Sequence, residues 1–285
     1  MSPPLRSGFR TAAKTVLSKT SGYIAEAGFT HSLSPARNCT FACTYCYVPT
    51  MRIYGGLKPE DWKRWGQFTT FKSNSAELLE RELRPGQRIY CSPLVDPYQP
   101  AERSEEIMPR ILDALAESPP RVFTIQTRGP LILRDLDRLK ILASRTTLRV
   151  SFSITTNRDE IRRLYEPQCA SIEERLDTVR ALSAAGVETY ATLAPLLPCE
   201  PEKLVRAALE TSRRDLIGDP LHVRATKRHG ATTREVAFKI SSAHGHDDWL
   251  DAQRQQRMVE QIDRIARAAG FSFTAGTRGF AKLAL

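Results

Sequence analysis

The sequence predicts an α/β protein built around a parallel β-sheet. Segments rich in β-branched and aromatic residues alternate along the chain with amphipathic helical patterns. Such alternation is typical of parallel strands joined by right-handed helical crossovers. The 285 residues can bury a large core, and no internal repeat or linker divides them.

The predicted elements follow one another in a regular order. Strands are predicted over residues 28–35, 88–94, 122–127, 147–154 and 187–195. Helices are predicted over residues 75–83, 104–118, 131–144, 171–186 and 199–215. Gly186 is placed to end one of these helices as a C-cap. A last helix, within residues 247–270, follows the polar turn "HGH" and takes Asp247 or Asp248 as its N-cap.

Composition and the N-terminal tail narrow the class of protein. Hydrophobic residues make up 41% and charged residues 26%, as in ordinary globular proteins. No run of about 18 apolar residues predicts a membrane span. The tail "MSPPLRSGFRTAAKTVLSK" is basic and lacks the apolar segment of a secretory signal. A transit peptide stays an alternative, but we expect a disordered or docking arm on a cytoplasmic protein.

The chain is strongly basic, with a net charge of +10 and an isoelectric point near 9.5. This balance suits a polyanionic partner such as nucleic acid. Part of the excess is local, because residues 221–239 hold five Lys or Arg against the single acid Glu235. This segment is either a solvated face or an edge that contacts phosphates.

Three cysteines, Cys39, Cys43 and Cys46, stand within eight positions in "NCTFACTYCYVP". Without an export signal, clustered thiols bind metal more often than they form disulfides. A zinc site needs a fourth ligand, and no C-x2-C or H-x3-H pair follows. Three thiolates on an iron–sulfur cubane leave one iron open, which suits a catalytic cluster.

This C-x3-C-x2-C pattern, with Tyr45 before the third cysteine, resembles the signature of the radical SAM enzymes. The resemblance implies a [4Fe–4S] cluster whose open iron binds the amino and carboxylate groups of S-adenosylmethionine (SAM). One-electron reduction then releases a 5′-deoxyadenosyl radical. It also implies an electron donor, such as a reductase, a flavodoxin or a ferredoxin, and it places Tyr45 near the adenine.

The resemblance extends to the spore photoproduct lyase branch through blocks that include "WGQFTTFKSNSAELLE", "CSPLVDPYQPAE", "TRGPLILRD", "SFSITT" and "LAPLLP". The "DPYQPAE" form is similar to shorter relatives described as DNA repair photolyases. The branch implies a partial (β/α)6 TIM-type barrel, with chemistry at the C-terminal ends of the strands and a C-terminal helical extension. We therefore expect a basic arm (1–27), a radical SAM core (28–220) and an extension that caps the core (221–285).

The same resemblance implies cofactor contacts at four successive strand ends. Ser92 would contact the methionyl part of SAM, and Ser153 would reach its ribose side. Arg128 stands where the lyase has a lysine that contacts the carboxylate of SAM. Arginine keeps the positive charge, but its planar guanidinium group changes the geometry of that contact. Ala194 would offer a backbone group near the adenine.

Hydrogen transfer points to three further residues. Tyr45 and Tyr47 match a tyrosine pair that helps relay the radical in the lyase. Cys91 lies one position from the alignment of the lyase cysteine that returns a hydrogen atom. Adjacent strand residues face opposite sides, so a shift of one residue would turn the thiol away from the substrate, although this constraint weakens where the strand ends. Cys91 is therefore either the hydrogen donor or a buried structural cysteine.

Four other side chains are left with alternatives. Asp96 and Glu102 have no counterpart in the lyase, and each is placed to bind substrate or to cap the following helix; for Glu102 the cap is favoured. Cys169 and Cys199 could join Cys91 around an auxiliary cluster, although their spacings match no local ligand motif.

The sequence thus favours an enzyme that uses the deoxyadenosyl radical on DNA, in lesion repair. The alternative is a radical SAM enzyme that acts on RNA, a peptide or a small metabolite. A non-catalytic iron–sulfur module is disfavoured by the ordered strand-end contacts.

Overall fold

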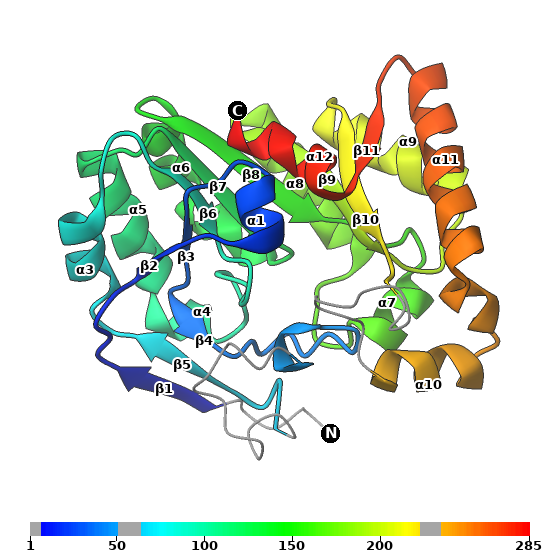
Figure 1. Cartoon of the computed structure of the whole chain (residues 1–285), viewed down its shortest axis with the longest axis horizontal. Helices are drawn as coiled ribbons and strands as arrows, with labels where there is room; N and C mark the ends of the chain where they lie inside the picture. Colours follow the sequence, from blue (N-terminus) through cyan, green and yellow to red (C-terminus); the bar gives the residue numbers. More distant parts are fainter. Residues whose placement is uncertain (1–6, 51–63, 223–234) are drawn as a thin grey trace.

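The computed structural model describes residues 7–50, 64–222 and 235–285 (Figure 1). They form two sheets, an eight-stranded sheet in the order β11-β10-β9-β8-β7-β6-β3-β2 and a three-stranded sheet in the order β1-β5-β4. All neighbours in the large sheet are parallel except β2 and β3. The predicted α/β class with a mostly parallel sheet is confirmed, and no strand pair among the described residues closes this sheet.

The five predicted strands are β3 and β6 to β9. The large sheet consists of β2 (Leu17–Lys19), β3 (His31–Leu33), β6 (Arg88–Cys91), β7 (Val122–Thr127), β8 (Thr147–Ser153), β9 (Glu188–Leu196), β10 (Leu216–Pro220) and β11 (Phe273–Ala275). The small sheet consists of β1 (Ser7–Thr11), β4 (Ala36–Arg37) and β5 (Phe68–Lys72). Strand β10 was not predicted, because its sequence "LIGDP" contains three residues that disfavour strands.

Helices connect the parallel strands as predicted. The helices are α1 (Gly22–Glu26), α3 (Ser75–Glu82), α4 (Glu102–Glu105), α5 (Ile107–Glu117), α6 (Leu136–Ala143), α7 (Asp159–Tyr165), α8 (Ile172–Ala184), α9 (Pro201–Ser212), α10 (Glu235–Ala243), α11 (Ala252–Ala268) and α12 (Gly276–Ala281). Short 3₁₀ helices are η1 (Val48–Thr50), η2 (Pro130–Asp135), η4 (Asp247–Leu250) and η5 (Lys282–Ala284). None of the described helices is long and apolar enough to cross a membrane.

The predicted helix over 104–118 is divided between α4 and α5 at Glu106, which has φ of 49°. Pro109 explains the break, because its ring would clash with the carbonyl group of Glu105 in a continuous helix. Ala185 is the C-cap of α8, and Gly186 follows it with φ of 82°, so the predicted glycine ends the helix from the position after the cap.

The predicted N-cap of the last long helix was wrong. Asp247 and Asp248 begin the 3₁₀ helix η4 instead. Asp251 caps α11, because its Oδ1 accepts a hydrogen bond of 2.7 Å from the backbone N–H of Arg254.

The two faces of the large sheet bury different partners. On one face Tyr90, Tyr190 and Ile217 pack with Phe280 and neighbouring residues of α1 and α12, which lie over the sheet in Figure 1. We call this the inner face. The opposite, outer face packs its aliphatic and aromatic side chains against α5, α6, α8 and α9 in the main core. Because side chains alternate along a strand, each strand residue can be assigned to one face.

Candidate functional site

The three clustered cysteines lie on the loop between β4 and η1, which we call the cluster loop (residues 38–47). Asn38 and Ala42 have positive φ angles of 64° and 55°, so the loop curls tightly. Cys39 and Cys43 are buried, and Cys46 is partly exposed. Burial raises the pKa of the Cys39 thiol. The contact with Cys169 lowers the pKa of the Cys43 thiol, and the charge of Arg128 lowers it further against the effect of burial.

Among the described residues, no three His, Cys, Asp or Glu side chains are placed to hold a single metal ion. A zinc ion needs such convergence, because its ligands all meet one centre. In an iron–sulfur cubane each thiolate binds a separate iron, so the three thiols need not converge. The arrangement is thus compatible with the iron–sulfur cluster that the cysteine spacing predicts.

A buried network of charged groups lies beside the cluster loop. Glu166, in the loop between α7 and α8, is completely buried. Its Oε1 accepts hydrogen bonds from Tyr45 Oη and from Arg128 Nη1, and Arg128 Nη1 also donates to Tyr45 Oη. On the other side, Oε2 lies 2.6 Å from Nη2 of Arg175, which is also completely buried. The network thus joins the cluster loop, the end of β7 and helix α8.

The arginines fix the charge state of this network. Burial opposes ionisation of Glu166, but Arg175 and Arg128 outweigh it and lower the pKa of this carboxyl group to about 2. Burial raises the pKa of Tyr45 well above its usual range. At neutral pH the site therefore holds a carboxylate, two guanidinium groups and a neutral phenol.

Two predicted cofactor contacts, Ser92 and Ser153, carry buried hydroxyl groups without a hydrogen-bond partner anywhere in the described structure. Ser153 ends β8 and shares the inner face with Ser151. Ser92 and Arg128 follow β6 and β7, so the three residues stand at neighbouring strand ends. Buried hydroxyl groups are normally paired, so these two keep a hydrogen-bonding capacity that a ligand can use.

Asp96 holds the end of β7 to the loop after β6. Its carboxylate accepts hydrogen bonds from Thr127 Oγ1 at 2.6 Å, from the backbone N–H of Arg128 at 2.8 Å and from that of Tyr98 at 2.9 Å. Burial nevertheless raises the pKa of Asp96. The carboxylate is therefore engaged by the protein itself. Glu102 accepts a hydrogen bond of 2.8 Å from the N–H of Met108, in the first turn of α5, which confirms its predicted capping role.

The remaining candidates are divided between the two faces. Ala194 packs against the inner-face cluster. Cys91 pairs across the sheet with Leu33 and Ile125 and belongs to the outer-face core, where burial raises its pKa. Tyr47 is partly exposed, and its Oη donates a hydrogen bond of 2.8 Å to the carbonyl oxygen of Pro93. The role of Cys91 as a hydrogen donor stays a prediction, which its place on the outer face disfavours.

Among the described residues, the structure does not bring together Cys91, Cys169 and Cys199, the three cysteines considered for an auxiliary cluster. Cys169 instead lies beside the cluster loop, with its Sγ 4.0 Å from Sγ of Cys43. Cys91 lies under the helices of the outer face, and Cys199 follows β9. This arrangement gives no support to an auxiliary site within the described residues.

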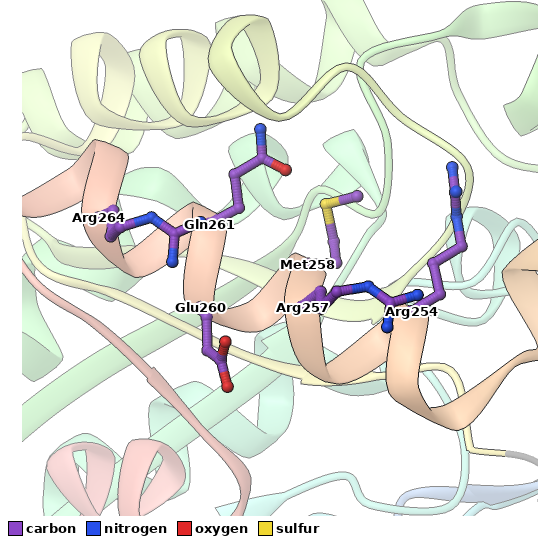
Figure 2. A pocket seen from close by; sticks show the side chains of 6 residues that line it. All are labelled: Arg254, Arg257, Met258, Glu260, Gln261 and Arg264. Carbon is purple, nitrogen blue, oxygen red and sulfur yellow. The ribbon is translucent and has the colours of Figure 1, made fainter.

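A hollow of about 440 Å³ lies along α11, away from all of these residues. Figure 2 shows its lining, which consists of Arg254, Arg257, Met258, Glu260, Gln261 and Arg264. Two of the arginines face carboxylates, with Arg254 3.0 Å from Asp248 and Arg257 3.9 Å from Asp251. Because every lining residue comes from one helix, this is a groove on a solvated surface and not the site of chemistry.

A family model described as "Radical SAM superfamily" matches residues 33–211, more than half of the chain. This chain belongs to the radical SAM superfamily. Spore photoproduct lyase has a similar structure, with a TM-score of 0.58 and 15% identity over 90% of this chain and 79% of the lyase chain. A radical SAM methyltransferase from Sphaerobacter thermophilus has a TM-score of 0.50 at 17% identity, over 86% of this chain and 65% of its own. At these identities the likeness shows the fold alone.

Relatives in sequence include uncharacterized proteins of several organisms. An uncharacterized protein of Methanocaldococcus jannaschii is 30% identical over 163 residues, which are 56% of this chain and 58% of the relative. An uncharacterized protein of Mycobacterium tuberculosis strain H37Rv is 31% identical over 174 residues, which are 60% of this chain and 50% of the relative. This chain therefore spans less than two thirds of either relative.

Radical SAM enzymes use a [4Fe–4S] cluster and SAM, and they need an electron donor. The residues observed here fit that cofactor pair. Three thiols stand on one curled loop, and Arg128 beside them offers a cation for a carboxylate. The unpartnered hydroxyl groups of Ser92 and Ser153 offer hydrogen bonds at adjoining strand ends.

Glu166 and Arg175, which form the centre of this buried network, were not identified from the sequence. One signal was present in α8, where Ile172, Arg175, Val179 and Leu182 form the buried stripe. An arginine within an apolar stripe indicates a buried ionic partner. Nothing local to Glu166 identifies Arg128, 38 residues earlier, as its partner.

Proposed function

We propose that this radical SAM protein binds its cluster through Cys39, Cys43 and Cys46 and reductively cleaves SAM to act on DNA, in lesion repair. The observation that carries the proposal is the pair of buried, unpartnered hydroxyl groups at the ends of β6 and β8. They flank the end of β7, where Arg128 lies beside the cluster loop.

Each residue has a distinct task in the proposal. The three thiolates hold the cluster, and the absence of a fourth thiolate on the loop leaves one iron for SAM. Arg128 pairs with the methionyl carboxylate, Ser92 and Ser153 donate hydrogen bonds to the methionyl and ribose parts, and Ala194 offers its backbone near the adenine. When bound and reduced, the cofactors supply a 5′-deoxyadenosyl radical. The protein orients that chemistry and keeps water away from it.

The tyrosines beside the last cluster cysteine are assigned to hydrogen return. Tyr45 is buried and bonded to Glu166, whereas Tyr47 is partly exposed and reaches the loop after β6. A pair with one buried and one exposed member suits transfer between the interior and a bound substrate. Cys91 lies on the outer face of the sheet, so its thiol would have to move to the inner face to donate a hydrogen atom.

The substrate assignment rests on charge and on the resemblance to the lyase. A net charge of +10 favours a polyanion. Most of the basic segment 221–239 lies outside the described residues, and Lys239 pairs with Glu235 at 3.4 Å. A cytoplasmic reductase, flavodoxin or ferredoxin would supply the electron.

The test is anaerobic reconstitution of the cluster, reduction, and incubation with SAM and a dinucleoside spore photoproduct. We expect 5′-deoxyadenosine to form and the photoproduct to be converted back to two thymidines, both detected by liquid chromatography and mass spectrometry. A variant with all three loop cysteines replaced by Ala should form neither. Formation of 5′-deoxyadenosine without photoproduct reversal would keep the radical chemistry and reject this DNA substrate.

A further inference from the structure

Arg128, the proposed partner of the SAM carboxylate, is held from two sides by the protein. On one side Asp96 accepts its backbone N–H, and Asp96 Oδ2 lies 4.0 Å from its Nε. On the other side Glu166 accepts from its Nη1, in company with the phenol of Tyr45. The side chain of Arg128 as a whole keeps an exposed fraction of 15%.

Glu166 is in turn held by Arg175, whose side chain is completely buried. The Arg175 Nε donates to the carbonyl oxygen of Ala170 at 3.2 Å. Its Nη2 pairs with Oε2 of Glu166 at 2.6 Å, and its Nη1 has no hydrogen-bond partner within the described structure. Burying a guanidinium group with so few directed bonds is costly, and a purely packing role would be met better by an apolar side chain.

The charges of the network explain what Arg175 contributes. With their carboxyl groups ionised, Glu166 and Asp96 balance Arg128 and Arg175, so the four groups are neutral together. Without Arg175 the set would carry one negative charge. A negative site of low dielectric would repel the carboxylate that Arg128 is proposed to bind.

We propose that Glu166, supported by Arg175, is the positioning residue for Arg128 and thereby sets the affinity for the carboxylate of SAM. This inference rests on the proposed function of Arg128. Glu166 fixes the direction of the Arg128 guanidinium group. The positive charge of Arg175 offsets the negative charge of Glu166, so that Arg128 keeps a charge for the SAM carboxylate. Neither residue needs to touch the cofactor.

A double-mutant cycle on the cluster-loaded protein tests this role. SAM binding is measured anaerobically by calorimetry for the wild type, Glu166→Gln, Arg128→Ala and the double variant. We expect Glu166→Gln to weaken binding about 5- to 20-fold in the wild-type background and by less than about 2-fold when Arg128 is already absent. Equal effects in both backgrounds, or no effect in the wild type, would overturn the proposal.

Variants of Arg175 test the same proposal independently, because Arg175→Lys can restore the charge that Arg175→Met removes. Arg175→Met should weaken SAM binding about 10-fold, and Arg175→Lys, which keeps the charge, should recover most of that loss. Cluster content and melting temperature are recorded for every variant. If Glu166→Gln does not fold, Glu166→Asp keeps the charge but withdraws it by one methylene, and a loss of about 3- to 10-fold is expected. Unchanged binding by Glu166→Asp and by Arg175→Met would equally reject the proposal.

A matched control lies in the same protein. Glu102→Gln alters another buried carboxylate, whose arginine partner is Arg134. Within the described structure, Glu102 forms no hydrogen bond or ion pair with the residues proposed to bind SAM. We expect it to lower the melting temperature without changing SAM affinity. If the wild type itself failed to bind SAM, the proposed function would fall. Wild-type binding combined with an unaltered Glu166→Gln variant would overturn only the positioning role.

Discussion

Two buried networks of arginine and carboxylate groups lie near the same edge of the large sheet, and they differ in how far their hydrogen bonds are satisfied. In the first, Arg134 forms a two-pronged contact with Asp135, with both N–O distances at 2.9 Å, and also reaches Glu102 at 3.1 Å. Glu102 in addition caps α5. We call this set the Arg134 network.

The second set, which we call the Glu166 network, joins Arg128, Arg175 and Tyr45 around Glu166. Here Nη1 of Arg175 has no hydrogen-bond partner within the described residues, and the hydroxyl groups of Ser92 and Ser153 at the neighbouring strand ends are unpartnered. The side chains of the Arg134 network are paired with one another, whereas the Glu166 network keeps this unpaired Nη1. The difference fits our proposal that the first network holds the segments after β6 and β7 together and that the second positions Arg128 for a ligand.

The largest expected effect concerns the Arg134 network. Arg134→Met leaves Glu102 and Asp135 buried without their cation, and we expect a loss of about 3 kcal/mol in the free energy of unfolding. SAM affinity of the folded fraction should be unchanged. Urea unfolding followed by circular dichroism measures the first quantity, and calorimetry the second. A large loss of SAM affinity at unchanged stability would erase the distinction between the networks.

Acid should affect the two networks in opposite directions. The pKa of Glu166 is lowered to about 2 in the folded protein, so its ion pairs stabilise the fold above pH 4.5 and that contribution is lost as the pH falls toward 2. The stability gap between wild type and Glu166→Gln should therefore shrink by up to about 3 kcal/mol between pH 5 and pH 2.

For Glu102 we expect the opposite pH dependence of the stability difference between the wild type and the Gln variant. Burial raises its pKa, so protonation is easier in the folded state and its contribution becomes more favourable as the pH falls. Relative to Glu102→Gln, the wild type should gain stability on acidification from pH 7 to pH 4. Parallel pH trends for the two Gln variants would contradict the assignment of charge states.

The next effect concerns ligand binding. Arg128→Ala removes the cation offered to the SAM carboxylate and should weaken SAM binding by about 1.5–3 kcal/mol. Arg128→Lys should recover part of the loss, because it restores a charge without the planar fork. An unchanged binding isotherm for the alanine variant would remove Arg128 from the cofactor site.

The smallest effect is expected at Cys91, on the outer face. Cys91→Ala should cost about 1 kcal/mol of stability as a small core truncation and leave SAM cleavage unaltered. The products formed from the substrate radical decide whether Cys91 is the hydrogen donor. If this variant cleaves SAM normally but accumulates side products of the substrate, Cys91 is the hydrogen donor despite its position.

The elements with strong local patterns were predictable from the sequence. Strand β7 occurs over the predicted residues 122–127, because its β-branched and aromatic residues fit no other element. Strand β10 was missed because Gly218, Asp219 and Pro220 weaken its pattern, and only pairing with β9 and β11 makes it a strand.

The cluster loop of the candidate site was predictable, because its three cysteines are local in sequence. The network behind it was not, since Tyr45 and Glu166 are 121 residues apart and Cys43 and Cys169 are 126 residues apart. Such contacts depend on how the strands and helices pack. The cap of α11 failed for a smaller reason, because three aspartates lie within five positions and local patterns do not select among them.

The most direct test of the account is the electron paramagnetic resonance spectrum of the reduced, reconstituted protein with and without SAM. The account predicts one [4Fe–4S] cluster per chain, absent when Cys39, Cys43 and Cys46 are replaced by Ala, with a spectrum that SAM changes because the open iron accepts it. The Arg128→Ala variant should need more SAM for the same change, and Arg134→Met should not. A cluster spectrum that saturating SAM leaves unchanged would contradict the account.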